Sequence, residues 1–372
     1  MAIARTDTSV LGRWWWTVDR WTLLALLLLA GFGMVLAMAA SPPVAERLDL
    51  DSLHFVRRHA ILLLPALIMM VGISLLTPRQ TRRIAVIALV GALALLALTL
   101  VVGTEIKGAR RWITVFGLSM QASEFVKPAF AVVAAWMFSA HRLGQAVPGN
   151  AISMGLFALV LALLLAQPDV GQAFVVSAVW FGQWFLAGLP MVWVALLVAF
   201  GVAGLVAAYF IFPHVASRID RFLDPASGDS YQVDRAMEAF VNGGLWGRGP
   251  GEGTVKAHLP DAHSDFILAV AGEEFGLILC LVIVALFAFV VLRGFIRVLQ
   301  VNNLFVVLAA AGLLTQFALQ ALINMASTAN LMPTKGMTLP FISYGGSSLI
   351  ALAFGMGMLL ALTRKRPGGG AA

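Results

Sequence analysis

Three carboxylates at the start of a long apolar stretch are the residues of this sequence best placed to do chemistry. In LPDAHSDFILAVAGEEFGLILCLVIVALFAFVV, residues 259–291, Asp265, Glu273 and Glu274 lie at or just inside the beginning of the apolar run. A carboxylate in hydrocarbon costs about 2.5–3.5 kcal/mol on insertion scales, so an ionisable residue there is a functional-site hypothesis by default. A partly dry site raises the pKa of a lone carboxylate toward neutrality, which suits a general base.

The spacing of the three acids predicts different roles for them. If residues 264–292 form one helix, Asp265 and Glu273 lie roughly 80° apart around its axis, and Asp265 and Glu274 lie on nearly opposite sides. We therefore expect Glu273 to line the same cavity as Asp265, and Glu274 to pair with a neighbouring helix.

Two further polar segments flank predicted helices. Residues 103–127 carry Arg110 beside Trp112 and then Glu124 and Lys127, an i,i+3 pair that can meet on one helix face. The pair is either mutually neutralised at a helix end or the charged wall of a water-filled cavity. In QPDVGQ, residues 167–172, Asp169 is either the cap of the following helix or a functional acid.

Two loops complete the polar set. Within the long segment 213–263, YQVDRAMEAFVNGG predicts a short surface helix that ends at its glycines. The glycine-dense GRGPGEGTVK matches neither nucleotide-binding fingerprint, and it is either a plain connection or a loop that offers N–H groups to phosphate oxygens. Residues 330–348 carry Lys335 just before the last apolar run. The sequence has no zinc-ligand spacing. A site in which carboxylates hold a divalent cation, Mg²⁺ or Mn²⁺, remains an alternative.

Composition sets the class of protein that must position these residues. The chain has 372 residues, of which 60% are hydrophobic and only 12% charged, about half the charge of a soluble domain. This composition is typical of a polytopic membrane protein. Its single cysteine, Cys280, excludes an intrachain disulfide. The net charge of +7 comes from Arg and Lys that punctuate loops, which suits membrane topology and anionic lipid headgroups and predicts no nucleic-acid partner.

A spanning helix needs about 20 mostly apolar residues, and this rule predicts an all-α fold with ten transmembrane helices in one domain over residues 1–372. The predicted spans lie near 22–40, 60–76, 83–102, 123–140, 150–166, 170–187, 190–212, 264–292, 304–328 and 340–363. The segment 213–263 is then the one long extracytoplasmic loop.

The positive-inside rule orients the spans. Ten spans place both termini on one side, and the short segments on that side contain only two acids, Asp7 and Asp19. Their basic residues include Arg5, Arg13, Arg20, Arg79, Arg82, Arg83, Arg142, Arg293, Arg297 and those of the tail TRKRPGGG. Because long loops count little for orientation, both termini are expected in the cytoplasm and the polar loops outside.

The polar segments, taken together and in order, resemble one family. KGARRWI, QASEFVK, QPDVGQ, RFLDP, SYQVDRA, GGLWGRGPGEGTVKAHLPDAHSDFILAVAGEEFG and PTKGMTLPFISYGGSS are similar to motifs of the SEDS proteins (shape, elongation, division and sporulation). The resemblance runs from the first span to the tenth. The lysine in PTKGMTLPFISYGGSS is typical of the cell-division branch rather than the rod-elongation branch.

The resemblance implies a peptidoglycan glycosyltransferase of the cytoplasmic (inner) membrane, active on its outer face. Such enzymes polymerise glycan strands from lipid II, a disaccharide-pentapeptide on undecaprenyl diphosphate, and form β-1,4 links with release of the lipid diphosphate. The resemblance also implies a class B penicillin-binding protein, which crosslinks the product, and other division proteins as partners. The family's essential Asp falls on Asp265, in SDF rather than the usual TDF, and QASE replaces the more common QPSE.

The implied chemistry assigns roles to the remaining candidates. Asp265 is the candidate base for the acceptor hydroxyl, or alternatively the ligand of a divalent cation that faces the diphosphate. Cations that could bind the diphosphate or the carboxylates of the peptide are Lys127, Lys335, Arg110 and Arg221. The other candidate substrate-binding residues are Trp112, Glu124, Asp169, Gln232, Lys256, His263, Glu273 and Ser343.

Two other functions compete with polymerisation. A lipid II flippase would also need a cavity with buried charges, but along the full depth of the membrane, whereas most charges here cluster on one face. A non-catalytic scaffold of the division machinery would not need Asp265. The charge distribution favours chemistry at the outer surface.

Overall fold

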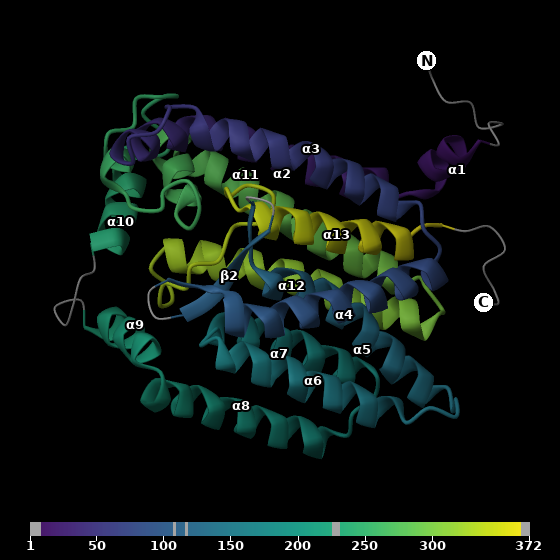
Figure 1. Cartoon of the computed structure of the whole chain (residues 1–372). Helices are drawn as coiled ribbons and strands as arrows, with labels where there is room; N and C mark the ends of the chain where they lie inside the picture. The colour runs from purple at the N-terminus through teal and green to yellow at the C-terminus, as the bar shows by residue number, and fades with distance from the viewer. Residues whose placement is uncertain (1–8, 107–108, 116–117, 225–230, 366–372) are drawn as a thin grey trace.

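The apolar runs of the sequence fold into long helices that lie side by side in the computed structural model, which describes residues 9–106, 109–115, 118–224 and 231–365. Figure 1 shows the arrangement. The helices are α1 (Val10–Thr17), α2 (Arg20–Arg47), α3 (His54–Ser74), α4 (Pro78–Val102), α5 (Ala122–Arg142), α6 (Gly149–Ala166), α7 (Val170–Leu186), α8 (Met191–Ile211), α9 (Pro213–Leu223), α10 (Tyr231–Gly243), the 3₁₀ helix η2 (Val255–His258), α11 (Ile267–Val298), α12 (Leu304–Thr328) and α13 (Gly346–Leu362). The strands are β1 (Thr104–Ile106), β2 (Ala109–Val115) and β3 (Leu118–Met120).

Each of the ten predicted spans overlaps one helix, from α2 to α8 and from α11 to α13. Seven of these helices are long and apolar enough to cross a membrane, namely α2, α3, α4, α6, α8, α11 and α12. The apolar helices α7 and α13 have only 17 residues each. The chain is therefore a multi-pass membrane protein, and the count of ten spans stays a prediction.

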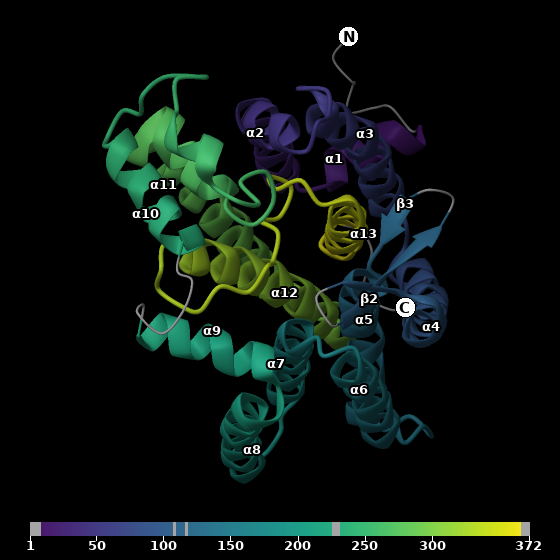
Figure 2. The same ribbon diagram turned by 60° about the vertical axis from the view of Figure 1, so that its left-hand side comes forward.

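Helix α5 lies at the centre of the bundle and α8 at its edge. All but a few of the residues of α5 are buried, and it packs against α4, α6, α7, α12 and α13. Helix α13 packs in turn against α3, α5 and α12, as Figure 2 shows. Only Ala208 is buried in α8, whose apolar side chains otherwise point outward, as expected for a helix that faces lipid.

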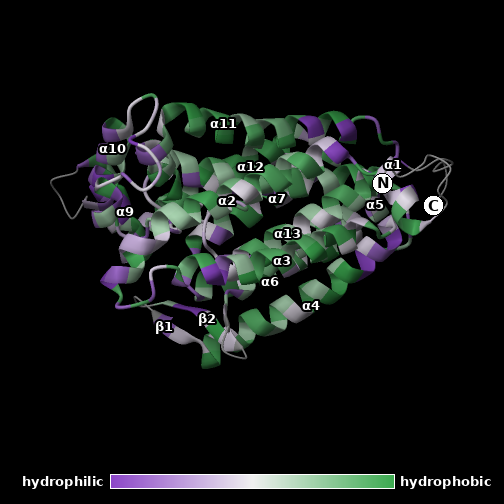
Figure 3. Cartoon of the chain, turned by 90° about the horizontal axis from the view of Figure 1, so that it is seen from above, coloured by the Kyte–Doolittle hydropathy of each residue, from purple (hydrophilic) through white to green (hydrophobic). Residues whose placement is uncertain are grey.

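Polar residues gather at the two ends of the bundle. Figure 3 shows apolar helices between a hydrophilic end around α9, α10 and the strands and a second hydrophilic end beside α1 and both described chain ends. Lys365 N donates to Thr17 O at this second end, so the two ends of the described chain meet there. Arg5, Asp7 and the tail beyond Lys365, which entered the orientation argument, lie outside the described residues, as do motif positions 107–108 and 225–230.

Two predicted boundaries are wrong in a way that matters for the site. Helix α11 begins at Ile267 rather than 264, because Asp261–Phe266 form a turn in which three backbone N–H groups donate to Asp261 O. Asp265 therefore precedes the helix, and its predicted angle to Glu273 does not apply. Helix α13 begins at Gly346 rather than 340, because the backbone turns at Phe341, where φ is 63°.

The segments outside the spans hold more structure than predicted. The expected surface helix is confirmed as α10, which ends at Gly243 and packs against α11. A second amphipathic helix, α9, follows α8 directly. Strands β1, β2 and β3 form an antiparallel sheet in that order, which the all-α prediction missed. The strands have only three to seven residues, so the alternation of apolar and polar residues is too short to identify them in the sequence.

Candidate active site

A large cavity lies at the end of the bundle that carries α9 and the sheet. Its volume is about 1250 Å³, which exceeds the usual range for drug-sized ligands. Its Arg, His, Asp and Glu lining residues are Arg58, Arg111, Glu124, His214, Arg218, Arg221, Asp261, His263 and Asp265. They come from the sheet, α9, the starts of α3 and α5, and the turn before α11, so a ligand there meets charges of both signs.

Asp265 lies in the wall of this cavity, and polar side chains of α12 hold its backbone. Asn324 Nδ2 donates to Asp265 O at 2.9 Å and to Met337 O at 2.6 Å. Thr328 Oγ1, one helical turn further, lies 3.3 Å from the same Asp265 carbonyl. Asn324 thus joins the turn that carries Asp265 to the loop before α13, and fixes both relative to α12.

The loop before α13 contacts the turn that carries Asp265. Ser343 Oγ accepts from Leu339 N at 2.8 Å and donates to Ser264 O at 2.5 Å. Ser343 is buried and ties the two segments together instead of lining the cavity. Gly336 has φ of +57°, and a Cβ there would lie 3.3 Å from Asp265 Oδ2, so this loop approaches the carboxylate closely.

Sequence reasoning missed two functional candidates, Arg111 and Arg218. Arg111 lines the cavity from β2, where Arg110 was predicted. Arg218 faces the cavity from α9 with His214 and the predicted Arg221. Burial, and then the nearby Arg111 and Arg221, lower the pKa of Arg218, while the carboxylate of Asp265 raises it. The 214, 218, 221 spacing places these residues on one helix face, which was the available signal.

Several predicted residues do line the cavity with Asp265. They are Trp112, Glu124, Arg221, Gln232 and His263. The imidazole of His263 lies 4.3 Å from the Phe55 ring and 5.4 Å from the Tyr344 ring, measured between centroids. Burial lowers the pKa of His263 to about 4, so it is neutral at pH 7. Arg110 instead forms an exposed ion pair with Glu105 at 3.4 Å.

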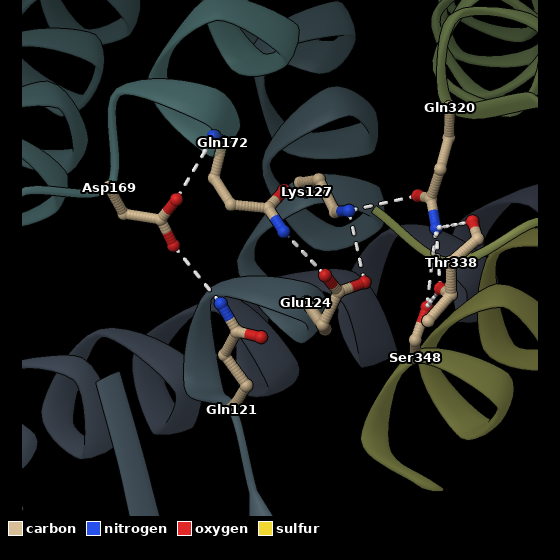
Figure 4. A network of polar contacts seen from close by, with 8 residues as sticks. All are labelled: Gln121, Glu124, Lys127, Asp169, Gln172, Gln320, Thr338 and Ser348. Atoms are coloured by element: carbon tan, nitrogen blue, oxygen red, sulfur yellow. Dashed lines mark hydrogen bonds and ion pairs between the residues drawn. The ribbon is translucent and has the colours of Figure 1, made fainter. Parts of the chain in front are cut away.

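Glu124 and Lys127 form a neutralised pair inside a buried polar network (Figure 4). Lys127 Nζ lies 3.0 Å from Glu124 Oε2 and 2.9 Å from Gln320 Oε1. Gln320 Nε2 lies within hydrogen-bond range of Thr338 and Ser348, so the network joins α5 to α12 and α13. Glu124 reaches the cavity, but Lys127 is buried behind it, and its charge is committed to Glu124.

Asp169 belongs to the same network as the cap of α7. Its carboxylate accepts from Gln172 N at 3.4 Å and from Gln121 Nε2 at 3.0 Å, which confirms the capping role. Burial raises the pKa of Asp169, and the nearby Arg111 acts to lower it. Lys335 Nζ lies 4.8 Å above the Phe174 ring, and burial lowers the pKa of Lys335 to about 8.

Glu273 does not share the cavity of Asp265. Its Oε1 accepts from Thr254 N at 2.8 Å and from Val255 N at 2.7 Å, and its Oε2 accepts from Lys256 N at 2.8 Å. Asn242 Nδ2 donates to Oε1 as well, at 2.9 Å. The part of the glycine-dense loop at the start of η2 therefore presents its N–H groups to a carboxylate of α11. Of the two alternatives left by the sequence, a connection or a phosphate-binding loop, these N–H groups serve neither phosphate nor solvent.

The preceding part of that loop supports a kink in α11. Gly276 has φ of 77°, which interrupts the helix. Arg248 N donates to Glu273 O at 2.9 Å and Gly249 N to Glu274 O at 3.0 Å, so the loop satisfies carbonyls that the kink releases. A Cβ at Gly247 would lie 2.2 Å from Glu274 O, and therefore only glycine fits there.

Lys256 and Glu274 form a buried ion pair outside the Asp265 cavity, so Glu274 pairs with η2 and not with a neighbouring long helix. Lys256 Nζ also donates to Ala39 O at 3.1 Å. That carbonyl has no helical donor because residue 43 is proline, which lacks an N–H. Lys256 thus has a structural role at the α2–α11 contact.

Comparisons with known proteins agree with this architecture. The FtsW/RodA/SpoVE model, described as "Cell cycle protein", matches residues 20–367. A probable peptidoglycan glycosyltransferase FtsW of Caulobacter vibrioides is 47% identical over 99% of this chain and 94% of its own length. One of Escherichia coli O6:H1 is 34% identical over 92% of this chain and 85% of its own length.

Solved structures share the fold. A chain from a peptidoglycan synthase complex, described as coordinating polymerization and crosslinking, has a TM-score of 0.76 and 29% identity over 93% of this chain and 97% of that chain. The rod shape determining protein RodA of Thermus thermophilus has a TM-score of 0.67 and 26% identity over 94% of this chain and 97% of that chain. The chain belongs to the FtsW/RodA/SpoVE family of cell cycle proteins, the SEDS family.

Proposed function

We propose that this protein polymerises peptidoglycan glycan strands from lipid II during cell division. The observation that carries the proposal is the position of Asp265, in the wall of a cavity of about 1250 Å³ that also exposes Arg111, Arg218 and Arg221. The curated relatives named peptidoglycan glycosyltransferase FtsW support the reaction, and their name supports the division role.

Asp265 acts as the base in this proposal. The 4-hydroxyl of the acceptor sugar is a weak nucleophile, so removal of its proton by a carboxylate within hydrogen-bond reach assists attack on the anomeric carbon. The donor link is α and the product link is β, so one in-line displacement with inversion is sufficient. The C–O bond to the diphosphate breaks as the glycosidic bond forms, and undecaprenyl diphosphate leaves with the bonding electrons.

The arginines of the cavity receive the leaving group. The diphosphate gathers negative charge as it departs, and guanidinium groups bind phosphate oxygens in a bidentate manner. Arg218 and Arg221 lie on one face of α9, and Arg111 donates to Gln167 O and Pro168 O from the sheet. We therefore assign diphosphate binding to α9 and β2, rather than to Lys127 or Lys335.

A divalent cation would fit this site as part of the substrate complex. The described residues contain no group of three or more His, Cys, Asp or Glu side chains that could hold a metal ion. Mg²⁺ is commonly held by one or two carboxylates together with substrate phosphates. Mg²⁺ or Mn²⁺ would then be held by Asp265 and the diphosphate, and would neutralise the charge of the leaving group.

The charge distribution also supports the proposed topology and partner. Every ionisable residue of the cavity comes from one end of the bundle, which favours polymerisation at one surface over flipping through the full depth. We place this end outside the cytoplasmic (inner) membrane and both termini in the cytoplasm. The similar chain from a peptidoglycan synthase complex supports a class B penicillin-binding protein as partner, and further division proteins remain proposed partners.

Incubation of the purified chain and its class B partner with labelled lipid II tests the proposal. We expect glycan ladders on a gel when crosslinking by the partner is blocked. A preparation that binds lipid II but forms no ladder would contradict polymerisation, and lipid II movement across vesicles would then favour the flippase.

Asn324→Ala tests whether the contact with α12 positions Asp265. We expect kcat to fall by about 10- to 100-fold, because a displacement of about 1 Å at a reacting group costs that much, while KM changes little. The neighbouring Ser327→Ala is the matched control, since Ser327 Oγ donates only to Asn324 O within the same helix. Equal rates in both variants, or a change confined to thermal stability, would contradict the positioning role.

A further inference from the structure

A second charged pocket lies at the far end of α11 from Asp265. Its volume is about 390 Å³, and its lining includes Arg293, Arg297 and Lys365 together with Leu292 and Ile296. The reaction proposed above uses none of these residues. We call this the Arg293/Arg297 pocket.

The pocket carries an excess of positive charge. Asp19, the N-cap of α2, accepts from Arg293 Nε at 2.8 Å and lies 3.1 Å from Arg297 Nε. Burial acts to raise the pKa of Asp19, but the bond from Arg293 and the charge of Arg297 bring it below its usual value, so Asp19 is ionised. Three cations against this one carboxylate leave a net charge of +2.

One guanidinium nitrogen of Arg297 lacks an acceptor. Arg297 Nη1 is buried and has no hydrogen-bond partner among the residues that the structure describes. The Arg297 side chain is only 18% exposed, so water reaches it poorly. Arg297 therefore has hydrogen-bonding capacity that no described residue uses, and an anion reaches this nitrogen only when the side chain turns toward the pocket.

The depth of the pocket places it where lipid headgroups lie. The outward apolar face of α11 runs from Leu277 to Ile296, and 19 residues at 1.5 Å each span about 28 Å, close to the ~30 Å of the hydrocarbon core. Leu292 is 63% exposed and Ile296 59% exposed, so the pocket opens beside an apolar surface.

Aromatic residues mark the same boundary. The guanidinium of Arg20, the first residue of α2, lies 5.7 Å from the ring centroid of Trp15 and 5.1 Å from that of Trp16, both in α1. Tryptophan and arginine are enriched where a membrane protein meets the headgroups. Because Thr17 contacts Lys365, this belt adjoins the pocket.

We propose that the Arg293/Arg297 pocket binds the phosphate of an anionic membrane phospholipid. The guanidinium of Arg297 and the ammonium of Lys365 hold the headgroup, while Leu292 and Ile296 contact the first part of an acyl chain. The apolar side distinguishes a lipid from free phosphate, which would bury no hydrocarbon. Basic pockets between transmembrane helices bind such headgroups in other membrane proteins.

Native mass spectrometry of the full chain in detergent, titrated with phosphatidylglycerol or phosphatidylcholine, tests the proposal. We expect the wild type to retain phosphatidylglycerol more tightly than phosphatidylcholine. In the double variant Arg297→Gln/Lys365→Gln, retention of phosphatidylglycerol should weaken about fivefold for each cation removed. The matched control is Arg79→Gln with Arg83→Gln, two exposed arginines of α4 at the same end but outside the pocket.

Each remaining outcome overturns the proposal. Equal retention by wild type and the pocket variant would remove the site, and equal weakening in the control would indicate diffuse attraction instead. Displacement of phosphatidylglycerol by inorganic phosphate at constant ionic strength would indicate a general phosphate site. Lys365→Gln alone, at an exposed position, provides the same comparison if the double variant does not fold.

Discussion

Asp265→Asn is expected to stop glycan polymerisation without unfolding the protein. Asparagine keeps the size of the side chain but cannot take a proton from the acceptor hydroxyl, and general base catalysis typically contributes about 10²–10⁴-fold. The backbone of Asp265 is held by Asn324 and Thr328 through its carbonyl, which the substitution leaves unchanged. The rate of ladder formation from labelled lipid II should therefore fall by at least about 10²-fold.

The control for this prediction is Glu252→Gln, which neutralises an exposed acid outside the cavity. Thermal unfolding of both variants should match the wild type, and both should bind lipid II. If Asp265→Asn formed ladders as fast as the control, Asp265 would not be the base. If both variants lost activity equally, the loss would reflect surface charge and not the chemistry of the cavity.

Much of this fold follows from the sequence, because a bilayer imposes a strong constraint. A helix that crosses hydrocarbon must be long and apolar, so ten apolar runs predicted ten helices, and each of them is present. The capping role of Asp169 could also be predicted, since its carboxylate accepts from the N–H of Gln172, only three residues along the chain. Interactions within one turn leave a local pattern that a single sequence displays.

The roles of Glu273 and Lys256 could not be predicted from a local sequence pattern. The donors to the Glu273 carboxylate lie 17 to 31 residues earlier in the chain, and the carbonyl that Lys256 reaches is 217 residues away. Sequence reasoning placed Glu273 by its angle to Asp265, and that angle failed because the helix begins two residues after Asp265. Two glycines of the loop, Gly247 and Gly253, are explained by close contact with α11, which only the tertiary structure displays.

Glu273→Ala is expected to cause the largest loss of stability among substitutions outside the cavity. It leaves three buried or partly buried backbone N–H groups, of Thr254, Val255 and Lys256, without their acceptor. Each unsatisfied donor costs about 1–3 kcal/mol, so the free energy of unfolding should fall by about 3 kcal/mol or more. Denaturant unfolding of the purified protein measures this change.

Glu273→Gln separates the charge of the side chain from its shape. The amide oxygen can still accept from Thr254 N and Val255 N, but the amide nitrogen faces Lys256 N, a second donor, and the negative charge is lost. We expect a loss between that of Glu273→Ala and zero, while the exposed Glu252→Ala in the same loop should change stability by no more than about 0.5 kcal/mol. Because this loop also holds the kink of α11 and Lys256, its release would loosen the α2–α11 contact without altering any group in the cavity. A Glu273→Ala protein that remained as stable as wild type yet lost polymerisation would instead return Glu273 to the substrate site, as its position in the sequence first indicated.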